Sequence, residues 1–339
     1  MSALDNALKS LAMRENLSVD ASKAAVAEIL EGQATEAKIA AFLTGLRVKG
    51  ETADELAGAV LAVRVAGETF ALDPCSQVVL DTCGTGGDGA CTLNISTATA
   101  IVVASCGVFV AKHGNRAASG NSGSAEVLVE LGVDTEAPID SLKRSFTELG
   151  ITFLLAPRFH PGLKYAGPVR KQLPFRTLFN LVGPLANPAR PSHQLIGVAG
   201  EAAADLVAET IAKLGTVRSA VITGFGGLDE VTLHGPTKVR WVESGSIALS
   251  EWNREDFGLM PVAIDQLRVT SPAESALRLR SILVGNEDPG RNMILANSAA
   301  ALLVAGQVAT LAQGVQVASR AIDSHRSIAL LEKWSRMSL

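Results

Sequence analysis

Apolar residues recur at helical spacing through the first part of the chain, residues 1–68. Two segments, 22–30 and 37–48, repeat them every three or four positions, and each follows a Ser or Thr that can cap a helix. Thr52 opens a third segment, and Glu55 stands three residues later, which is the pattern of a capping box. This pattern predicts a small all-helical domain.

The pattern changes beyond residue 74. Short apolar runs are followed by polar loops that contain glycine, and the first two loops are followed by helix-like segments. In chain order, the runs and helix-like segments are 77–80, 96–106, 108–111, 125–131 and 220–223. This alternation is typical of an α/β fold. We therefore expect residues 74–339 to form a domain with a central, mostly parallel sheet flanked by helices, whose loops open at the carboxyl edge of the sheet.

Two segments interrupt this alternation. Residues 157–193 contain seven prolines and little periodicity. We expect a long connection with one short helix, which crosses between the domains and adds a helical contribution from about 160–190 to the first domain. Residues 293–319 carry no charge, but glycines and amides divide them into pieces shorter than the roughly 20 apolar residues of a membrane span. They predict a buried helix pair and no membrane partner.

Composition narrows the class of protein. Hydrophobic residues make up 47% of the 339 residues and charged residues 19%, which excludes a disordered chain. The net charge of −4 argues against a protein that mainly binds nucleic-acid phosphates. Four cysteines without a CxxC pair disfavour a structural zinc site, and a start that does not read as a signal peptide predicts a reducing, cytoplasmic location.

The first glycine loop spans residues 81–89. Four glycines in six positions let backbone amides approach a ligand closely and form an anion-binding nest. Asn94 and Ser96 would point the same way in an extended segment, just before a helix whose first amides also favour phosphate. The loop is not a Walker A motif, and its GxGxxG spacing lacks the immediate helix of a dinucleotide site. Phosphate binding and a tight turn with a helix cap are both open.

The second loop, residues 112–124, combines two cations with several hydroxyl and amide side chains. This composition suits a polyanion. Lys112 ends an apolar run, where an unpaired charge would be costly, so it needs either an anionic ligand or a carboxylate partner. His113 is more typical of a structural residue than of a catalytic one.

Two carboxylates, Asp229 and Glu230, follow the third glycine loop, 224–227. Adjacent carboxylates repel unless a cation or solvent separates them, and Mg²⁺ is commonly held by one or two carboxylates together with substrate phosphates. A magnesium site and a solvated acidic turn are both open. Arg170 and Arg176 are likewise open between binding a carboxylate and forming an interdomain salt bridge.

Four segments of the chain resemble the anthranilate phosphoribosyltransferases in order and approximate spacing. These segments are 81–97, 112–124, 176–188 and 227–230, and the similarity covers nearly the whole chain. The resemblance implies a nucleoside-phosphorylase-like (class III phosphoribosyltransferase) fold. It implies transfer of the phosphoribosyl group from phosphoribosyl pyrophosphate to the amine of anthranilate, with release of pyrophosphate, in the biosynthesis of the aromatic amino acid tryptophan. It also implies a homodimer formed through the N-terminal helical domain and the use of Mg²⁺, two ions per active site.

The resemblance also assigns roles to residues. The magnesium ligands would be Ser96, Asp229 and Glu230, and the anthranilate contacts would be Gly84, Asn115 and Arg170, the last on the carboxylate. The donor would contact Gly84, Gly87, Asp88, Thr92, Asn94, Ile95, Ser96, Thr97, Lys112, His113, Gly114, Asn115, Arg116, Ala117, Ala118, Ser119, Gly120 and Ser124. No general base is assigned, because the amine of anthranilate is a neutral nucleophile at pH 7.

The chain departs from the family pattern at several positions, mostly nearer the acceptor. Pro174 stands where glycine is usual, Gly162 where alanine is common, and Thr223 and Gly226 where histidine and aspartate are common. The alternatives are therefore a transferase of the same fold with another acceptor, a pyrimidine nucleoside phosphorylase, and a non-catalytic relative that binds nucleic acid. The net negative charge disfavours the last of these.

Overall fold

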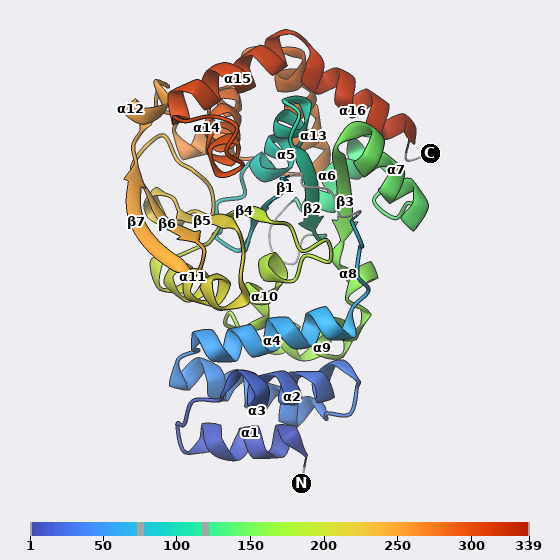
Figure 1. Cartoon of the computed structure of the whole chain (residues 1–339), viewed down its shortest axis with the longest axis vertical. Helices are drawn as coiled ribbons and strands as arrows, with labels where there is room; N and C mark the ends of the chain where they lie inside the picture. Colours follow the sequence, from blue (N-terminus) through green and yellow to red (C-terminus); the bar gives the residue numbers. More distant parts are fainter. Residues whose placement is uncertain (1, 73–77, 117–121, 338–339) are drawn as a thin grey trace.

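The computed structural model describes residues 2–72, 78–116 and 122–337, which form two parts of unequal size (Figure 1). The smaller part begins with α1 (Ala3–Ala12), α2 (Val19–Leu30), α3 (Glu36–Lys49) and α4 (Ala53–Ala66). Ser18 and Thr35 cap α2 and α3, and Thr52 forms the expected capping box with Glu55 at the start of α4. The helices and caps predicted for this part are confirmed.

A seven-stranded sheet forms the centre of the larger part. Its spatial order is β3 (Ile151–Leu155), β2 (Phe109–Gly114), β1 (Val79–Gly84), β4 (His193–Gly197), β5 (Arg218–Thr223), β6 (Thr237–Glu243) and β7 (Ser246–Trp252). The first five strands run parallel and the last two antiparallel, so the mostly parallel sheet is confirmed. Strands β1 and β2 are longer than predicted, because residues 81–84 also pair with β4 and residues 112–114 also pair with β3.

Helices cover both faces of the sheet (Figure 1). They are α5 (Ile95–Ser105), α6 (Ser124–Glu130), α7 (Ile139–Leu149), α11 (Glu201–Leu214), α12 (Arg254–Phe257), α13 (Pro272–Val284), α14 (Pro289–Val304), α15 (Leu311–Asp323) and α16 (Arg326–Met337), with short 3₁₀ helices η2 (Phe225–Gly227) and η3 (Ile264–Leu267). Leu80 and Val110 join the core with α5 and α14, whereas Val79 and Ala111 face α7. The two helices expected in 293–319 are present as α14 and α15, but only α14 is largely buried, because α15 buries one face. None of the helices described is long and apolar enough to cross a membrane.

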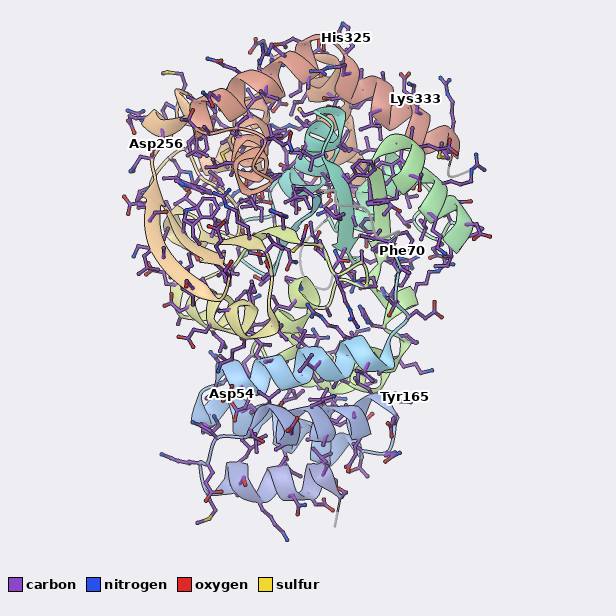
Figure 2. The ribbon with its side chains drawn as sticks, in the orientation of Figure 1. Asp54, Phe70, Tyr165, Asp256, His325 and Lys333 are labelled. Carbon is purple, nitrogen blue, oxygen red and sulfur yellow. The ribbon has the colours of Figure 1, made fainter. Side chains whose placement is uncertain are left out.

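The proline-rich connection is more regular than predicted. It contains α8 (Ala156–Phe159), η1 (Pro161–Tyr165), α9 (Gly167–Gln172) and α10 (Phe179–Leu185), so the expectation of one short helix was wrong. Prolines stand in the first turns of α8, η1 and α9, where an amide hydrogen would have no helical partner. Val169 joins the core of α1–α4. Phe70, which is labelled in Figure 2, packs edge-on against Phe146 of α7 and Phe159 of α8. The connection therefore ties the two parts together.

Candidate active site

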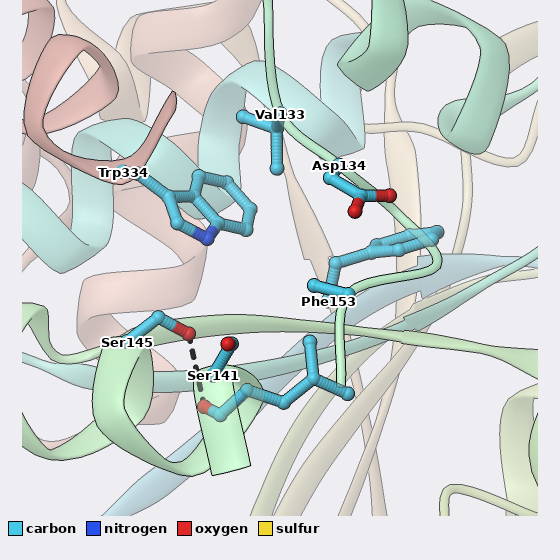
Figure 3. Close-up of a pocket in the computed structure, with 8 residues that line it drawn as sticks. Val133, Asp134, Ser141, Ser145, Phe153 and Trp334 are labelled. Carbon is cyan, nitrogen blue, oxygen red and sulfur yellow. Dashed lines mark hydrogen bonds between the residues drawn. The ribbon is translucent and has the colours of Figure 1, made fainter. Parts of the chain in front are cut away.

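A cleft opens where the connection crosses the carboxyl ends of β1 and β2. Its volume is about 420 Å³, and its walls are the ends of these strands, the first turn of α5, the carboxylates at 229–230 and parts of η1, α9 and α10. Figure 3 shows another hollow, beside Trp334, whose volume of about 10 Å³ has room for one water molecule. The cleft is large enough for small charged substrates and is lined by charged side chains, so it is the candidate active site.

Two glycines at the strand ends let the loop that carries Asp229 lie close to the sheet. Gly84 of β1 pairs with Gly197 of β4, and both lie against Asp229. A side chain at Gly84 would place its Cβ 2.5 Å from Oδ2 of Asp229, and a side chain at Gly197 would overlap the carbonyl oxygen of Asp229. The N–H of Gly86 donates a hydrogen bond of 2.6 Å to the same Oδ2. The loop can lie this close to the sheet because both positions lack a Cβ.

The glycine loop after β1 has the backbone that an anion nest requires. Gly86, Gly87 and Gly89 have φ angles of 65°, 73° and 76°, in the left-handed region that favours glycine. Arg176 lies against this loop, with its Nη1 3.4 Å from the carbonyl oxygen of Gly87. Backbone amides and a guanidinium therefore meet in one part of the cleft.

The first turn of α5 lines the same cleft. The helix begins at Ile95, so Asn94 and Ser96 do not belong to an extended segment, and that expectation was wrong. Both residues nevertheless line the cleft. Oδ1 of Asn94 accepts hydrogen bonds from the hydroxyls of Ser122 (2.7 Å) and Ser275 (2.9 Å), which fix the amide at the helix N-terminus. Backbone amides at such a terminus favour anions.

Lys112 is buried at the end of β2. Its Nζ donates hydrogen bonds to the carbonyl oxygen of Thr82 and, at 3.3 Å, to the hydroxyl of Ser96. Burial lowers the pKa of Lys112, and the nearby charge of Asp81 opposes that shift. Within the described ranges it forms no ion pair, so the carboxylate partner is present only as a more distant charge. Since Lys112 also lines the cleft, an anionic ligand can reach it.

His113 is almost completely buried next to Lys112. Its Nδ1 lies 3.0 Å from the carbonyl oxygen of Gly183, so this nitrogen carries the proton, and its ring packs edge-on against His160. Burial, and after it the charge of His160, lowers the pKa of His113 to about 3. A side chain that binds a proton this weakly is neutral at pH 7, which favours the structural interpretation of His113.

Asp229 and Glu230 lie half-buried across from Ser96, whose N–H donates a 3.3 Å hydrogen bond to Oε1 of Glu230. Burial and the neighbouring charge of Asp88 raise the pKa of Asp229 to about 7, and burial and Asp229 raise that of Glu230. In the described part of the chain, no three His, Cys, Asp or Glu side chains are grouped to hold a metal ion. Two repelling carboxylates beside a hydroxyl fit Mg²⁺, which completes its shell with substrate phosphates.

Arg170 reaches the cleft from α9. Its guanidinium carbon lies 5.8 Å from the centroid of the Phe179 ring, and burial lowers its pKa. Among the residues that the structure places, neither Arg170 nor Arg176 forms an ion pair. The interdomain salt bridge that the sequence left open is therefore not observed, and Arg170 can bind a carboxylate.

The cleft brings together most of the residues expected at the site. Those that line it are Gly84, Gly87, Asn94, Ser96, Lys112, His113, Gly114, Asn115, Arg116, Ser124, Arg170, Asp229 and Glu230. Asp88, Thr92, Ile95 and Thr97 do not line it, and the last two are buried. The predictions for Ala117, Ala118, Ser119 and Gly120 lie outside the described residues.

Known proteins resemble this chain over nearly its full length. Residues 5–67 match the helical bundle domain of a glycosyl transferase family, and residues 76–327 match its a/b domain. Anthranilate phosphoribosyltransferases from Chloroflexus aggregans and Novosphingobium aromaticivorans are both 44% identical to it, over 98% and 92% of this chain and 97% and 94% of their own. The chain belongs to the anthranilate phosphoribosyltransferase family.

Solved anthranilate phosphoribosyltransferases share the fold. The protein from Thermus thermophilus has a TM-score of 0.91 and 34% identity, covering 100% of this chain and 99% of that one. The protein from Saccharomyces cerevisiae in complex with PRPP and Mg has a TM-score of 0.90 and 28% identity, covering 99% and 97%. The family, the fold class and the glycosyltransferase class expected from the motifs are confirmed.

Several residues of the cleft were not assigned a role from the sequence. Those from the connection include His160, Leu163, Phe179, Asn180 and Pro184, together with Arg176, which was left open between a carboxylate contact and a salt bridge. Four of them belong to the segment 176–188 that resembles the anthranilate phosphoribosyltransferases, so that motif was the available signal. The helices that bring them to the cleft were hidden by the prolines.

Proposed function

We propose that this protein is an anthranilate phosphoribosyltransferase, which transfers the phosphoribosyl group of phosphoribosyl pyrophosphate to the amine of anthranilate in tryptophan biosynthesis. One observation carries the proposal: a single cleft joins a glycine nest, the buried Lys112 and the Asp229–Glu230 pair with Arg170, which has no ion-pair partner among the described residues. The glycine nest and Lys112 suit a pyrophosphate, the two carboxylates suit a Mg²⁺ ion that accompanies it, and Arg170 suits an aromatic carboxylate.

The charges of the cleft fit the reaction. Breaking the bond between ribose and pyrophosphate develops positive charge on the sugar and negative charge on the leaving group. The glycine loop, the N-terminus of α5 and Lys112 would stabilise the leaving pyrophosphate. Lys112 is already held by Thr82 and Ser96, so little reorganisation accompanies the reaction. Arg176, beside the glycine loop, would add a second cation.

Ser96, Asp229 and Glu230 would hold Mg²⁺. When bound, the ion neutralises charge on the leaving pyrophosphate. After burial, the charge of Asp229 is the main cause that raises the pKa of Glu230, which supports this assignment because a cation beside the two carboxylates would relieve the repulsion. We also infer two ions per site, for which Asp88, whose charge raises the pKa of Asp229, would be a further carboxylate near the pair. The yeast relative has been solved with PRPP and Mg.

The acceptor would lie between Arg170, Asn115 and Gly84. The planar guanidinium of Arg170 would bind the carboxylate of anthranilate with two parallel hydrogen bonds and so orient the amine. No general base is proposed, and the low pKa of His113 supports its exclusion. Another structure of the yeast relative contains 4-fluoroanthranilate, which supports an acceptor of this class.

We also infer a homodimer formed through the helical domain, in the cytoplasm. Met13 and Val48 of this domain are 74% and 72% exposed, so they are apolar side chains that such an interface would cover. The free thiols of Cys83, Cys91 and Cys106 suit a reducing compartment. Light scattering after size-exclusion chromatography measures the oligomeric state, and a monomer would contradict the first inference.

The test of the function is loss of anthranilate fluorescence with phosphoribosyl pyrophosphate and Mg²⁺ present. We expect activity that disappears when the metal is chelated. No consumption of anthranilate, with phosphoribosyl pyrophosphate still raising the melting temperature, would contradict the proposed acceptor. Salt-dependent binding to DNA in place of catalysis would favour the nucleic-acid-binding alternative.

A further inference from the structure

The short helix η1 separates the cleft from a second hollow. His160, just before η1, and Leu163, within it, line the cleft. Pro161, Gly162 and Tyr165 line a groove of about 500 Å³ on the helical domain. Because η1 has open space on both sides, its position depends on the few elements that support it by packing against it. These supports therefore also set the shape of this part of the cleft.

The C-terminal end of α2 is one such support, and it contacts η1 very closely. A side chain at Gly162 would place its Cβ 2.7 Å from the carbonyl oxygen of Leu30 and 3.1 Å from the Cβ of Leu30. Ordinary contacts begin at 3.4 Å, so one methyl group would force η1 and α2 apart by about 0.7 Å. The nearest atom belongs to the backbone of a helix, which cannot rotate away as a side chain can.

A second glycine makes the reciprocal contact. Gly32 ends the turn after α2 with a φ of 74°, and a Cβ there would lie 2.8 Å from the ring of Tyr165. Figure 2 shows Tyr165 beside the helical bundle. Each of the two segments therefore has a glycine where the other packs against it. Gly162 of η1 contacts the end of α2, and Gly32 after α2 contacts the Tyr165 ring.

We propose that Gly162 is a positioning residue for the acceptor, which seats η1 against α2 and thereby places Leu163 and His160 in the wall of the cleft. The acceptor is assigned under the proposed function, and this inference rests on that assignment. Alanine, which the family resemblance suggests at this position, does not fit the observed contact. The helical domain thus shapes the substrate site although none of its four N-terminal helices lines the cleft.

The test compares Gly162→Ala with Gly167→Ala. Gly167 lies five residues further on, and a Cβ there meets nothing within 4 Å, so the control makes the same change without a clash. A displacement of almost 1 Å can cost up to about 10²-fold, so we expect the KM for anthranilate to rise about 5- to 20-fold in Gly162→Ala. The KM for phosphoribosyl pyrophosphate should match that of the control. Equal KM values for anthranilate in both folded variants would overturn the inference.

A second measurement does not depend on activity. Tyr165 is the single tyrosine of the chain, so incorporated 3-fluorotyrosine gives a ¹⁹F resonance from η1 alone. We expect Gly162→Ala to shift this resonance and Gly167→Ala to leave it in place, and we expect anthranilate with phosphoribosyl pyrophosphate to shift it in the unaltered protein. A resonance that is insensitive to Gly162→Ala would overturn the inference even if the proposed reaction is correct.

The remaining outcomes separate this inference from the proposed function. If the unaltered protein consumes no anthranilate, the proposed function fails, while the ¹⁹F comparison still decides whether Gly162 seats η1. If Gly162→Ala does not fold, Tyr165→Ala removes the ring from Gly32 without adding bulk. We then expect a raised KM for anthranilate in Tyr165→Ala, and an unchanged value would overturn the inference.

Discussion

Replacing Gly84 with alanine tests whether the close contact between Asp229 and the edge of the sheet controls activity. The new Cβ would lie 2.5 Å from Oδ2 of Asp229. Ordinary contacts begin at 3.4 Å, so the carboxylate must move by about 0.9 Å, which weakens its 2.6 Å hydrogen bond from the N–H of Gly86. Because a misplacement of about 1 Å can cost roughly 10²-fold in rate, we expect kcat/KM to fall about 10²-fold. The Mg²⁺ concentration for half-maximal rate should rise.

The assay is the initial rate of anthranilate fluorescence loss over a Mg²⁺ titration, with Gly167→Ala as the control. Gly84 is also a proposed contact of anthranilate, so Gly197→Ala repeats the test from outside the cleft. Its Cβ would overlap the carbonyl oxygen of Asp229, yet Gly197 does not line the cleft. Rates within about threefold of the unaltered protein in both folded variants, with unchanged Mg²⁺ dependence, would refute the reasoning.

Three further predictions follow from the cleft. Asp229→Ala combined with Glu230→Ala should reduce turnover sharply and weaken the Mg²⁺ dependence, and near-normal turnover would contradict the metal assignment. Arg176→Ala should raise the KM for phosphoribosyl pyrophosphate about 10-fold, and an equal rise for anthranilate would count against its place beside the pyrophosphate. The pKa of His113 is about 3 in the folded protein and 6.5 ordinarily, so its contribution to stability is complete above pH 6.5 and is lost as the pH falls toward 3. The free energy of unfolding in urea should therefore fall by about 2 kcal/mol less in His113→Gln than in the unaltered protein when the pH is lowered from neutral to 5. An equal fall in both proteins would exclude this role.

The N-terminal helices could be predicted because their signals are local. The side chains of Ser18, Thr35 and Thr52 each accept a hydrogen bond from an N–H three residues further on, so the residues that begin each helix are adjacent in the sequence. The connection offers no such signal. A proline in the first turn of a helix and a proline that ends one look the same in the sequence, and helices of four to seven residues depend on packing for their stability.

The close contacts of Asp229 with Gly84 and Gly197 could not be predicted, for a different reason. Gly84, Gly197 and Asp229 lie far apart in the chain, and the contact exists because the sheet places β4 directly beside β1. The sequence indicated that Gly84 belongs to a phosphate loop, but it did not indicate that the carboxylate of Asp229 packs directly against this glycine. That the residues after β1 and β2 meet in one cleft could be predicted, since parallel strands end at one edge of a sheet. Contacts that depend on strand order were not.

The balance of charge in the cleft explains how a chain with a net negative charge can bind a polyanion. Lys112 and Arg176 lie close to Asp88, Asp229 and Glu230, so carboxylates outnumber cations around the glycine loop. Burial raises the pKa of both Asp229 and Glu230, and a neighbouring carboxylate adds to each shift, Asp88 for Asp229 and Asp229 for Glu230. A pyrophosphate placed beside them would meet like charge unless a cation lay between, so the site favours the donor together with its metal and disfavours it alone. On the proposed assignment, the carboxylate pair would make catalysis depend on magnesium, so its removal should weaken the metal dependence as well as the rate.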